Sequence, residues 1–199
     1  MVFSAANKQV SEVVIPLLTI CFVLQGLFTK SKKEKQKLYC AFIDFKKAFN
    51  SVYRDGLWYK LYNLGCKGRL LKVLMNMYSK IRCCVNTEYG FTDFFLTKMG
   101  VQQGAVPSPI LFCMYINDLK EWLAGEGDIS VNGTDVNLLM YADDIVVFTN
   151  SREVLQNCLD KMYDYCQRWK LSVNLKKTKI LIGNHRGPMS QHDFWFWGG

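Results

Sequence analysis

The sequence predicts an α/β (α+β) domain in which helices pack on one face of an antiparallel sheet. Short runs rich in aromatic and branched residues, of strand length, alternate with longer segments that repeat apolar residues at helical spacing. Such elements stack as layers, because each apolar face has to be buried against another. With 199 residues, 50% hydrophobic and 21% charged, the chain can bury one core. We expect one domain with at most a small appendage.

The charge balance favours a polyanionic partner. The chain has 25 lysine and arginine residues against 17 acidic residues, a net charge of +8, and such a balance is typical of proteins that bind nucleic acid. The eight cysteines form no CxxC pair, and most lie inside apolar runs. Reduced, buried thiols show this pattern, so the sequence argues against a secreted disulfide scaffold and against a zinc site.

Residues 1–37 hold six lysines and two acidic residues, so half of the net charge of +8 lies in this segment. An apolar run over residues 13–24 precedes the densest lysines, and it also fits a signal-peptide core or a membrane anchor. The run is too short to span a bilayer, contains Pro16, and is followed by no small-residue cleavage site. We therefore expect a buried helix whose solvent-facing end carries the lysines.

A strand and a helix follow. Residues 38–45 are rich in aromatic and branched side chains and predict a central strand that ends in Asp44. Asp55 is the expected N-cap of a helix that runs to residue 64 and is closed by Gly65.

The next segment predicts a second helix and a hairpin. Residues 67–80 repeat apolar side chains at helical spacing. The repeating residues are Leu70, Leu71, Leu74, Met77 and Tyr78. Residues 81–85 and 91–96 then pair as a hairpin around Tyr89-Gly90.

A loop over residues 100–107 leads into a helix that runs to residue 123. Ser108 and Pro109 are the expected N-cap and first helical residue, and glycines at positions 125 and 127 end the helix. A small hairpin around Asn132-Gly133 follows.

Two apolar runs, residues 138–141 and 145–148, predict a tight hairpin with Ala142-Asp143-Asp144 at its tip. Ser151 is the expected cap of a long helix to residue 170. The inner face of this helix consists of Leu155, Cys158, Leu159, Met162, Cys166 and Trp169.

The last predicted elements are strands at residues 171–175 and 179–182, separated by the basic turn Lys176-Lys177-Thr178. In the predicted sheet these strands join the strand that ends in Asp44 and the hairpin that carries the two aspartates. The helices over residues 108–123 and 151–170 cover one face, and the face with the carboxylates stays open for nucleic acid.

Two acids at a hairpin tip, with a third at the end of a central strand, require an explanation. Asp143 and Asp144 interrupt an apolar ribbon, where they repel one another and lose hydration unless a cation lies beside them. Mg²⁺ prefers hard carboxylate oxygens, and two such ions about 3.5–4 Å apart can clamp the oxygens of a phosphoryl transfer. Aspartate-rich turns are also common in solvent. The residues alone therefore do not distinguish a metal site from a solvated turn.

Four segments carry a resemblance to a known family. They are residues 41–52 (AFIDFKKAFNSV), residues 100–119 (GVQQGAVPSPILFCMYINDL), the tetrad Tyr141-Ala142-Asp143-Asp144, and residues 175–179 (LKKTK). In this order they resemble four successive palm motifs of reverse transcriptases. Their residues are most similar to those of the non-LTR (LINE-type) retrotransposon enzymes. The resemblance extends over residues 38–199 and implies an RNA-directed DNA polymerase with a palm fold.

The resemblance also implies a ligand set: an RNA template, a DNA primer and deoxynucleoside triphosphates. Asp44 and Asp143 would bind two Mg²⁺ ions, for which Mn²⁺ can substitute, with Asp144 beside them and the carbonyl of Phe45 as a further ligand. Such metals lower the pKa of the primer 3′-hydroxyl and neutralise charge on the triphosphate. No membrane partner is implied, and the family works inside the cell, in the nucleus or cytoplasm.

Further roles follow from the resemblance residue by residue. Phe49 matches a steric gate that excludes a 2′-hydroxyl, although it also fits a core phenylalanine. Gln103 and Gly104 match the pair that contacts the incoming nucleotide, where glycine lets the backbone come close. Tyr141 would stack under the primer terminus. Lys177 resembles the residue that protonates departing pyrophosphate, but Lys176 and Lys179 lie near enough to share that role, and a basic turn in solvent fits equally well.

The sequence also departs from the family pattern. Asn50 stands where Asp is usual, Gln102 where Arg is frequent, and Ala105 where Asp or Cys is common. Residues 1–37 contain no arginine and no Gly-Phe-Arg segment, so we expect them to form only a partial fingers-like basic helical segment.

Residues 195–199 resemble the stretch before the primer grip, so we expect residues 38–199 to be a palm domain without a thumb. Such a palm would be truncated at both ends and would come from a larger retrotransposon polyprotein. A catalytically inactive remnant with at most RNA-binding ability is the alternative.

Overall fold

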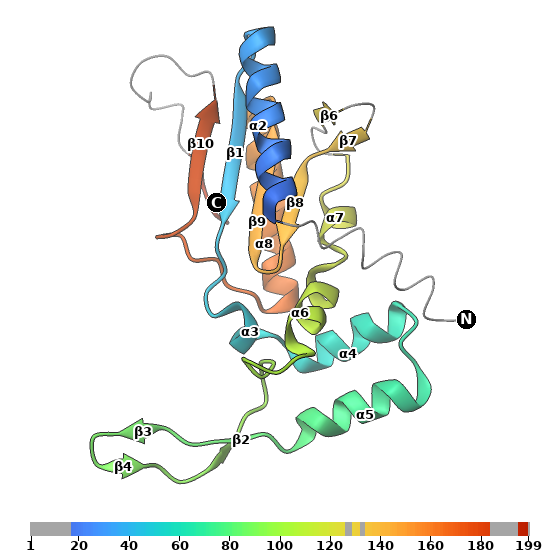
Figure 1. Ribbon diagram of the computed structural model, residues 1–199, viewed down its shortest axis with the longest axis vertical. Helices are drawn as coiled ribbons and strands as arrows, with labels where there is room; N and C mark the ends of the chain where they lie inside the picture. The colour runs from blue at the N-terminus through green and yellow to red at the C-terminus, as the bar shows by residue number, and fades with distance from the viewer. Residues whose placement is uncertain (1–16, 126–128, 132–133, 184–194, 199) are drawn as a thin grey trace.

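The computed structural model describes residues 17–125, 129–131, 134–183 and 195–198. Its centre is a four-stranded sheet in the order β10-β1-β9-β8, in which every neighbouring pair is antiparallel (Figure 1). The strands are β1 (Leu38–Ile43), β8 (Leu138–Tyr141), β9 (Asp144–Thr149) and β10 (Lys179–Gly183). The mixed fold with an antiparallel sheet is confirmed.

Helices and small ribbons surround the sheet. The helices are α2 (Leu17–Glu34), α3 (Ala48–Ser51), α4 (Arg54–Asn63), α5 (Gly68–Ser79), α6 (Ser108–Ile116), α7 (Leu119–Trp122) and α8 (Arg152–Trp169). The ribbon strands are β2 (Arg82–Cys83), β3 (Asn86–Thr87), β4 (Gly90–Phe91), β5 (Phe95–Leu96), β6 (Ile129–Val131) and β7 (Thr134–Val136). As Figure 1 shows, α5 and the β2–β5 ribbons lie at the end of the molecule away from α2.

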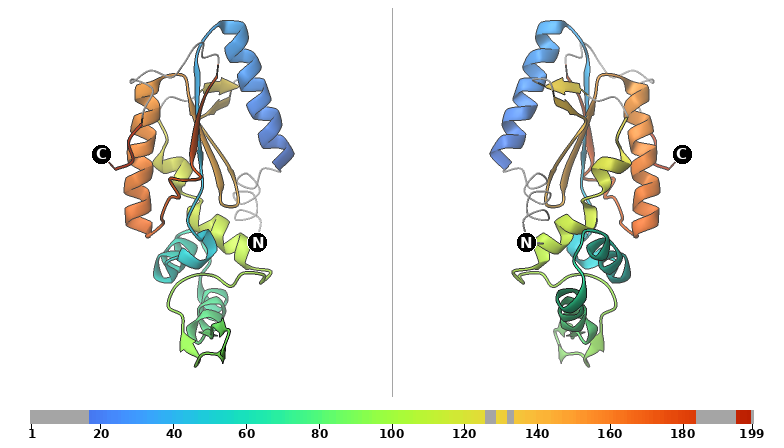
Figure 2. Two further views of the ribbon diagram at one scale, coloured as in Figure 1. Left: turned by 90° about the vertical axis from the view of Figure 1, so that its left-hand side faces the viewer. Right: turned by 90° about the vertical axis from the view of Figure 1, so that its right-hand side faces the viewer.

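The sheet is covered on both faces, which is one layer more than predicted. Alternate residues of β1 face opposite sides: Ala41 lies in the core cluster formed with α8, and Cys40 lies in a second cluster formed with Ile20 and Leu27 of α2. Figure 2 shows α2 and α8 on opposite sides of the sheet. Because β1 and β9 are apolar on both faces, each face needs a cover, and the face opposite α8 is open only beyond α2.

The α2 helix confirms part of the prediction for the N-terminal segment. Ile20 and Leu27 are buried, and Lys32 and Lys33 are exposed in the last turn, where cations favour the helix dipole. Phe22, however, is 71% exposed, so the apolar run is not buried all round. Residues 13–16 of that run lie outside the described residues. Within those residues, no helix combines the length and apolarity that a membrane span requires.

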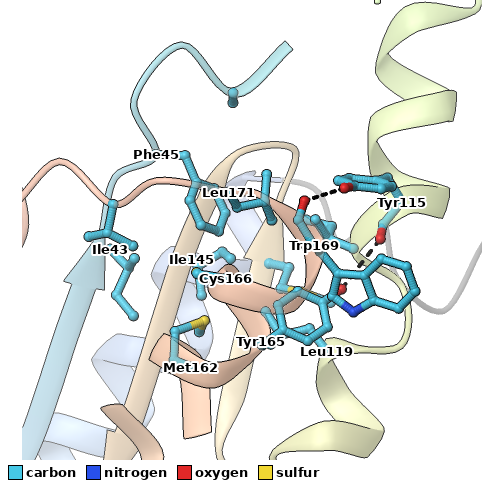
Figure 3. Packing of buried hydrophobic residues seen from close by; sticks show 14 of the residues in the cluster. Ile43, Phe45, Tyr115, Leu119, Ile145, Met162, Tyr165, Cys166, Trp169 and Leu171 are labelled. Carbon is cyan, nitrogen blue, oxygen red and sulfur yellow. Dashed lines mark hydrogen bonds between the residues drawn. The ribbon is translucent and has the colours of Figure 1, made fainter. Parts of the chain in front are cut away.

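The long helix and both ribbons follow their predictions. All six residues predicted for the inner face of α8 are buried. Figure 3 shows how Tyr165 and Trp169 of this helix pack beside Tyr115 of α6, whose hydroxyl donates a hydrogen bond to the Trp169 carbonyl. The β2–β5 and β3–β4 pairs form the predicted hairpin, although Glu88-Tyr89 forms its tip. The β6 and β7 strands pair as predicted, and their turn at 132–133 lies outside the described residues.

Several predicted helix boundaries are wrong. The N-cap of α4 is Tyr53, and Asp55 lies in the first turn; Gly65 does close this helix, with φ +89°. Pro107 is the N-cap of α6, because the Ser108 hydroxyl donates instead to the Gln102 carbonyl at 2.5 Å. That helix also ends at Ile116, and α7 continues separately.

Two further predictions need correction. Residues 171–175 form no strand, since β10 occupies the free edge of β1 and only Val173 bridges to Phe45. On α5, Tyr78 is buried as predicted, but Leu70 and Met77 are exposed, so its apolar face is only partly covered. Ser151 is the N-cap of α8, yet its hydroxyl donates to the Glu153 carboxylate at 2.6 Å.

Candidate active site

The sheet register brings the first and third motifs together. Ile43, the last residue of β1, pairs with Ile145 of β9, so Asp44, which follows the end of β1, lies next in register to Asp144, the first residue of β9. Tyr141, the last residue of β8, pairs directly with Asp144. Side chains of directly opposed residues lie on the same face of a sheet. By the alternation along β1 and β9, that is the face opposite α8.

The backbone around Asp44 is held by the segment that follows α8. The Asp44 amide donates to the Thr178 hydroxyl at 3.2 Å, and its carbonyl accepts from the Asn174 amide at 2.7 Å. The next residue, Phe45, bridges to Val173. These contacts fix the end of β1, although the strand pairing itself stops at Ile43.

A strained turn carries Asp143. Ala142 and Asp143 connect β8 to β9, and Ala142 has φ +52°. Tight two-residue hairpins need positive φ, which glycine and asparagine adopt at low cost and alanine does not. Such strain persists only where the surroundings hold it, and it is concentrated at functional sites.

Negative charge accumulates at this end of the sheet. Partial burial raises the pKa of the Asp144 carboxyl, and the charges of Asp143 and Asp44 raise it further. Burial chiefly raises the pKa of the Cys113 thiol in α6, with a smaller contribution from the charge of Asp143. The charges of Asp143 and Asp44 therefore act on the Asp144 carboxylate, and a bound cation would relieve this repulsion.

The donor chemistry suits a magnesium ion. Carboxylate oxygens are the ligands Mg²⁺ prefers, and this ion usually takes one or two carboxylates together with water and substrate phosphates. Among the residues that the structure describes, no group of three or more His, Cys, Asp and Glu side chains is arranged to hold a metal by itself. Asp44, Asp143 and Asp144 would therefore supply only part of the ligands of such an ion, with water or phosphate oxygens as the rest.

The loop after β5 brings the predicted nucleotide-binding residues together. Phe49, Gln103 and Gly104 line one open hollow of about 480 Å³. Gln103 and Gly104 are exposed, whereas the Phe49 ring is half-buried against Phe112, with centroids 5.2 Å apart. Phe49 is therefore both a packing residue and a wall of the hollow. Phe45 is buried, so only its backbone carbonyl is suited to the predicted role.

The same loop also borders a larger groove of about 1030 Å³. Gln103 and Gly104 share this groove with Asn50 and Gln102, two of the positions at which the sequence departs from the family pattern. Lys47, Arg54 and Arg82 add positive charge to its lining.

The remaining predicted residues lie on exposed turns. Tyr141 is 36% exposed next to the carboxylates. Lys177 is exposed on the turn at residues 174–178, which contacts the Asp44 backbone through Thr178. Lys179 donates to the Lys176 carbonyl at 2.9 Å, so its ammonium is engaged in the turn.

Two charged residues that the sequence interpretation missed are buried in α4. Arg54 and Lys60 are 8% and 5% exposed, and they share a face of the helix with Leu57 and Leu61. Lys60 donates to the Asp118 carboxylate at 2.6 Å and to the Tyr165 hydroxyl at 2.7 Å. A cation at a position of an apolar helical stripe is the signal that could have found both.

Comparison with known sequences places the chain in a family. The model described as "Reverse transcriptase (RNA-dependent DNA polymerase)" matches residues 3–198. The Retrovirus-related Pol polyprotein from type-2 retrotransposable element R2DM of Drosophila melanogaster is 30% identical over 147 residues, 74% of this chain and 14% of that protein. The RNA-directed DNA polymerase from mobile element jockey of Drosophila funebris is 26% identical over 162 residues, 78% of this chain and 17% of that protein. The chain thus spans less than a fifth of the length of these relatives.

Solved structures with the same fold are also known. Apo telomerase from Candida tropicalis superposes with a TM-score of 0.68 at 17% sequence identity, over 92% of this chain and 36% of that chain. A form of that enzyme truncated from the C-terminal domain gives a TM-score of 0.66 at 20% identity. These likenesses show a palm-type polymerase fold. The family match over almost the entire length and the similarity to the curated relatives establish that the chain belongs to the reverse transcriptase (RNA-dependent DNA polymerase) family and is related to the polymerases of non-LTR retrotransposons.

Proposed function

We propose that this chain carries the palm active site of an RNA-directed DNA polymerase, which adds deoxynucleotides to a primer 3′-hydroxyl on an RNA template. The observation that carries the proposal is the meeting of Asp44 with Asp143 and Asp144, far apart in the sequence, at one end of the sheet. Residues 38–199 would supply the palm, and residues 1–37 would belong to the fingers.

Asp44 and Asp143 would hold two Mg²⁺ or Mn²⁺ ions, which supply Lewis-acid stabilisation of the charge that develops on the phosphates. Asp144 and the Phe45 carbonyl would complete the protein's share of the ligands. In the reaction, the primer O3′ would lose its proton to solvent water and attack the α-phosphorus, and the bond from that phosphorus to the bridging oxygen would break to release pyrophosphate.

The remaining residues would bind and orient the substrates. Gln103 would hydrogen-bond to the incoming nucleotide, and Gly104 would let the backbone approach it closely. The Phe49 ring would press on the sugar at the 2′ position. Tyr141 would support the primer terminus by stacking, and Lys177 would donate a proton to the departing pyrophosphate.

Primer extension on a defined RNA template, with a DNA primer, all four deoxynucleotides and Mg²⁺, tests the proposal. We expect incorporation by the unchanged chain and a loss of at least about 100-fold in Asp143→Asn, which keeps the shape of the side chain but removes its charge. Asp164→Asn, an exposed carboxylate on α8, is the matched control and should retain activity.

Incorporation that survives Asp143→Asn would overturn the proposal. Absence of incorporation, combined with RNA binding whose log K falls with log salt concentration, would instead favour the inactive remnant.

A further inference from the structure

We infer that Arg54 is the positioning residue for the nucleotide-binding loop, defined here as residues 97–104. The inference rests on the proposed function, because that function gives Gln103 and Gly104 their role. Arg54 lies at the start of α4 and is 8% exposed. Among the described residues its guanidinium pairs with no carboxylate, and it donates to backbone carbonyls instead.

All five N–H groups of Arg54 are used. The Nε group donates to the Gly100 carbonyl at 2.9 Å. Nη1 donates to the carbonyls of Tyr78 at 3.0 Å and Thr97 at 2.6 Å. Nη2 donates to the Thr97 hydroxyl at 3.0 Å and to the Met99 carbonyl at 3.0 Å. Four of these five bonds end on the nucleotide-binding loop, so one side chain determines the path of its first half.

The fifth bond anchors the guanidinium to the end of α5. The Tyr78 carbonyl belongs to the last turn of that helix, where carbonyls lack helical partners and the dipole favours a cation. The Tyr78 ring lies 5.5 Å from the Arg54 guanidinium carbon. Arg54 therefore connects the loop to two helices, and movement of the loop requires the loss of charged hydrogen bonds.

Two more contacts fix the loop on the opposite side. The Gly100 amide donates to the Val52 carbonyl at 2.8 Å, and the Val101 amide donates to the Phe49 carbonyl at 2.7 Å. Gly100 has φ +83°, and a Cβ there would lie 2.8 Å from the Asn50 carbonyl oxygen. The start of the loop is thus clamped between Arg54 and the segment that carries Phe49.

A second anchor follows Gly100. The Ser108 hydroxyl donates to the Gln102 carbonyl at 2.5 Å and lies 3.4 Å from the Tyr78 hydroxyl. Gln103 and Gly104 immediately follow this anchor and are exposed. Contacts that begin at Arg54 therefore determine the position of Gln103 and Gly104 relative to Phe49. Arg54 acts on these two residues through the loop.

Lysine cannot reproduce this arrangement. An ammonium has three donors around one point, whereas the guanidinium spreads five donors in a plane. Arg54→Lys keeps the charge and much of the apolar stem, so we expect it to fold while leaving several loop carbonyls without their donor. Arg69→Lys is the matched control, because Arg69 is an exposed arginine on α5.

Amide hydrogen exchange on the full chain, without substrates, decides whether Arg54 positions the loop. In Arg54→Lys we expect exchange at Gly100 and Val101 to accelerate by about 10-fold or more, with amides of β1 and β9 within about twofold of the unchanged chain. Arg69→Lys should match the unchanged chain throughout. Unchanged exchange at Gly100 and Val101 would overturn the inference, as would equal acceleration in the sheet, which would make Arg54 a general core residue.

Steady-state kinetics then test the consequence for the substrate. We expect Arg54→Lys to raise KM for deoxynucleotides about 10-fold while kcat changes less than about threefold, because ground-state and transition-state binding weaken together. A fall in kcat at unchanged KM would contradict the inference. Failure of the unchanged chain to incorporate nucleotides counts against the proposed function alone, since the exchange result stands independently.

Discussion

Replacing Lys60 with methionine tests the buried polar contact between α4 and α8. The Lys60 ammonium donates to the Asp118 carboxylate, the Tyr165 hydroxyl and the Tyr115 carbonyl. It also lies 3.8 Å from the centroid of the Trp169 ring. Burial nevertheless dominates and lowers the pKa of Lys60 from 10.5 to about 8, against the opposing effect of Asp118. Methionine retains most of the apolar stem without a charge.

The sign and size of the effect follow from this shift. Between about pH 8 and pH 10.5 the unfolded chain binds more protons at Lys60 than the folded chain does, so this residue makes the free energy of unfolding rise with pH in that window. At about 1.4 kcal/mol for each pKa unit, the full rise is on the order of 3 kcal/mol. Below about pH 8 the cost of burying the ammonium is fully present.

Urea denaturation at pH 7, 8, 9 and 10 measures the effect as a difference between two proteins. The subtraction is needed because burial raises the pKa of Cys40 and Cys166 to about 12, which lowers stability at high pH in both proteins. We expect the free energy of unfolding of the unchanged chain, relative to that of Lys60→Met, to increase by on the order of 2–3 kcal/mol between pH 7 and pH 10. Lys72→Met, on the exposed surface of α5, should show no such trend. Parallel profiles for Lys60→Met and the unchanged chain would refute the reasoning.

Three further predictions concern the turn that carries Asp143, the nucleotide-binding loop and Phe49. Ala142→Val should be less stable than Ala142→Gly by about 2 kcal/mol in urea denaturation, because a branched side chain is strained at the positive φ of this turn; equal stabilities would contradict the strained geometry. Gly100→Ala should cost about 2–4 kcal/mol, since a Cβ would strike the Asn50 backbone, whereas Gly65→Ala, with open space around it, should cost only about 1 kcal/mol. Phe49→Val should increase ribonucleotide relative to deoxynucleotide incorporation by about 10-fold in single-nucleotide extension; an unchanged ratio would assign Phe49 to packing alone.

Much of the fold could be predicted because two periodicities are strong in this sequence. The buried face of α8 repeats at helical spacing, and every residue assigned to it is buried. The strand before Asp44 is apolar at nearly every position, as a central strand covered on both faces has to be. The tight hairpin that carries Asp143 could also be predicted from the sequence pattern, because two apolar runs flank a short polar interruption.

The parts that could not be predicted depend on competing partners. Ser108 fits an N-cap by residue type, yet its hydroxyl bonds to the Gln102 carbonyl. Residues 171–175 have strand composition, but the edge of β1 that they would need is occupied by β10. The α2 helix has a large apolar residue, Phe22, on its exposed side, so its pattern alone does not reveal the face that meets the sheet.

The sequence predicted the residues of the candidate site and placed its carboxylates on one face of one sheet, but it did not predict the register of the strands. The motifs indicated Asp44, Asp143 and Asp144, but their meeting depends on the register that pairs Ile43 with Ile145. The role inferred for Arg54 was invisible in the sequence, because its partners are backbone carbonyls. A carbonyl carries no signature of residue type, so only coordinates show such a contact.

Titration with Mn²⁺, followed by paramagnetic broadening of amide resonances, tests most directly whether the three carboxylates form one cation site. We expect the earliest broadening at residues 44–46, 142–145 and 174–178, and its reversal by excess Mg²⁺. Combining Asp44→Asn with Asp143→Asn should abolish this local broadening, while Asp164→Asn should leave it intact. Broadening that persists in the double variant, or that is spread over the acidic residues of the surface from the start, would contradict a shared metal site at the end of the sheet.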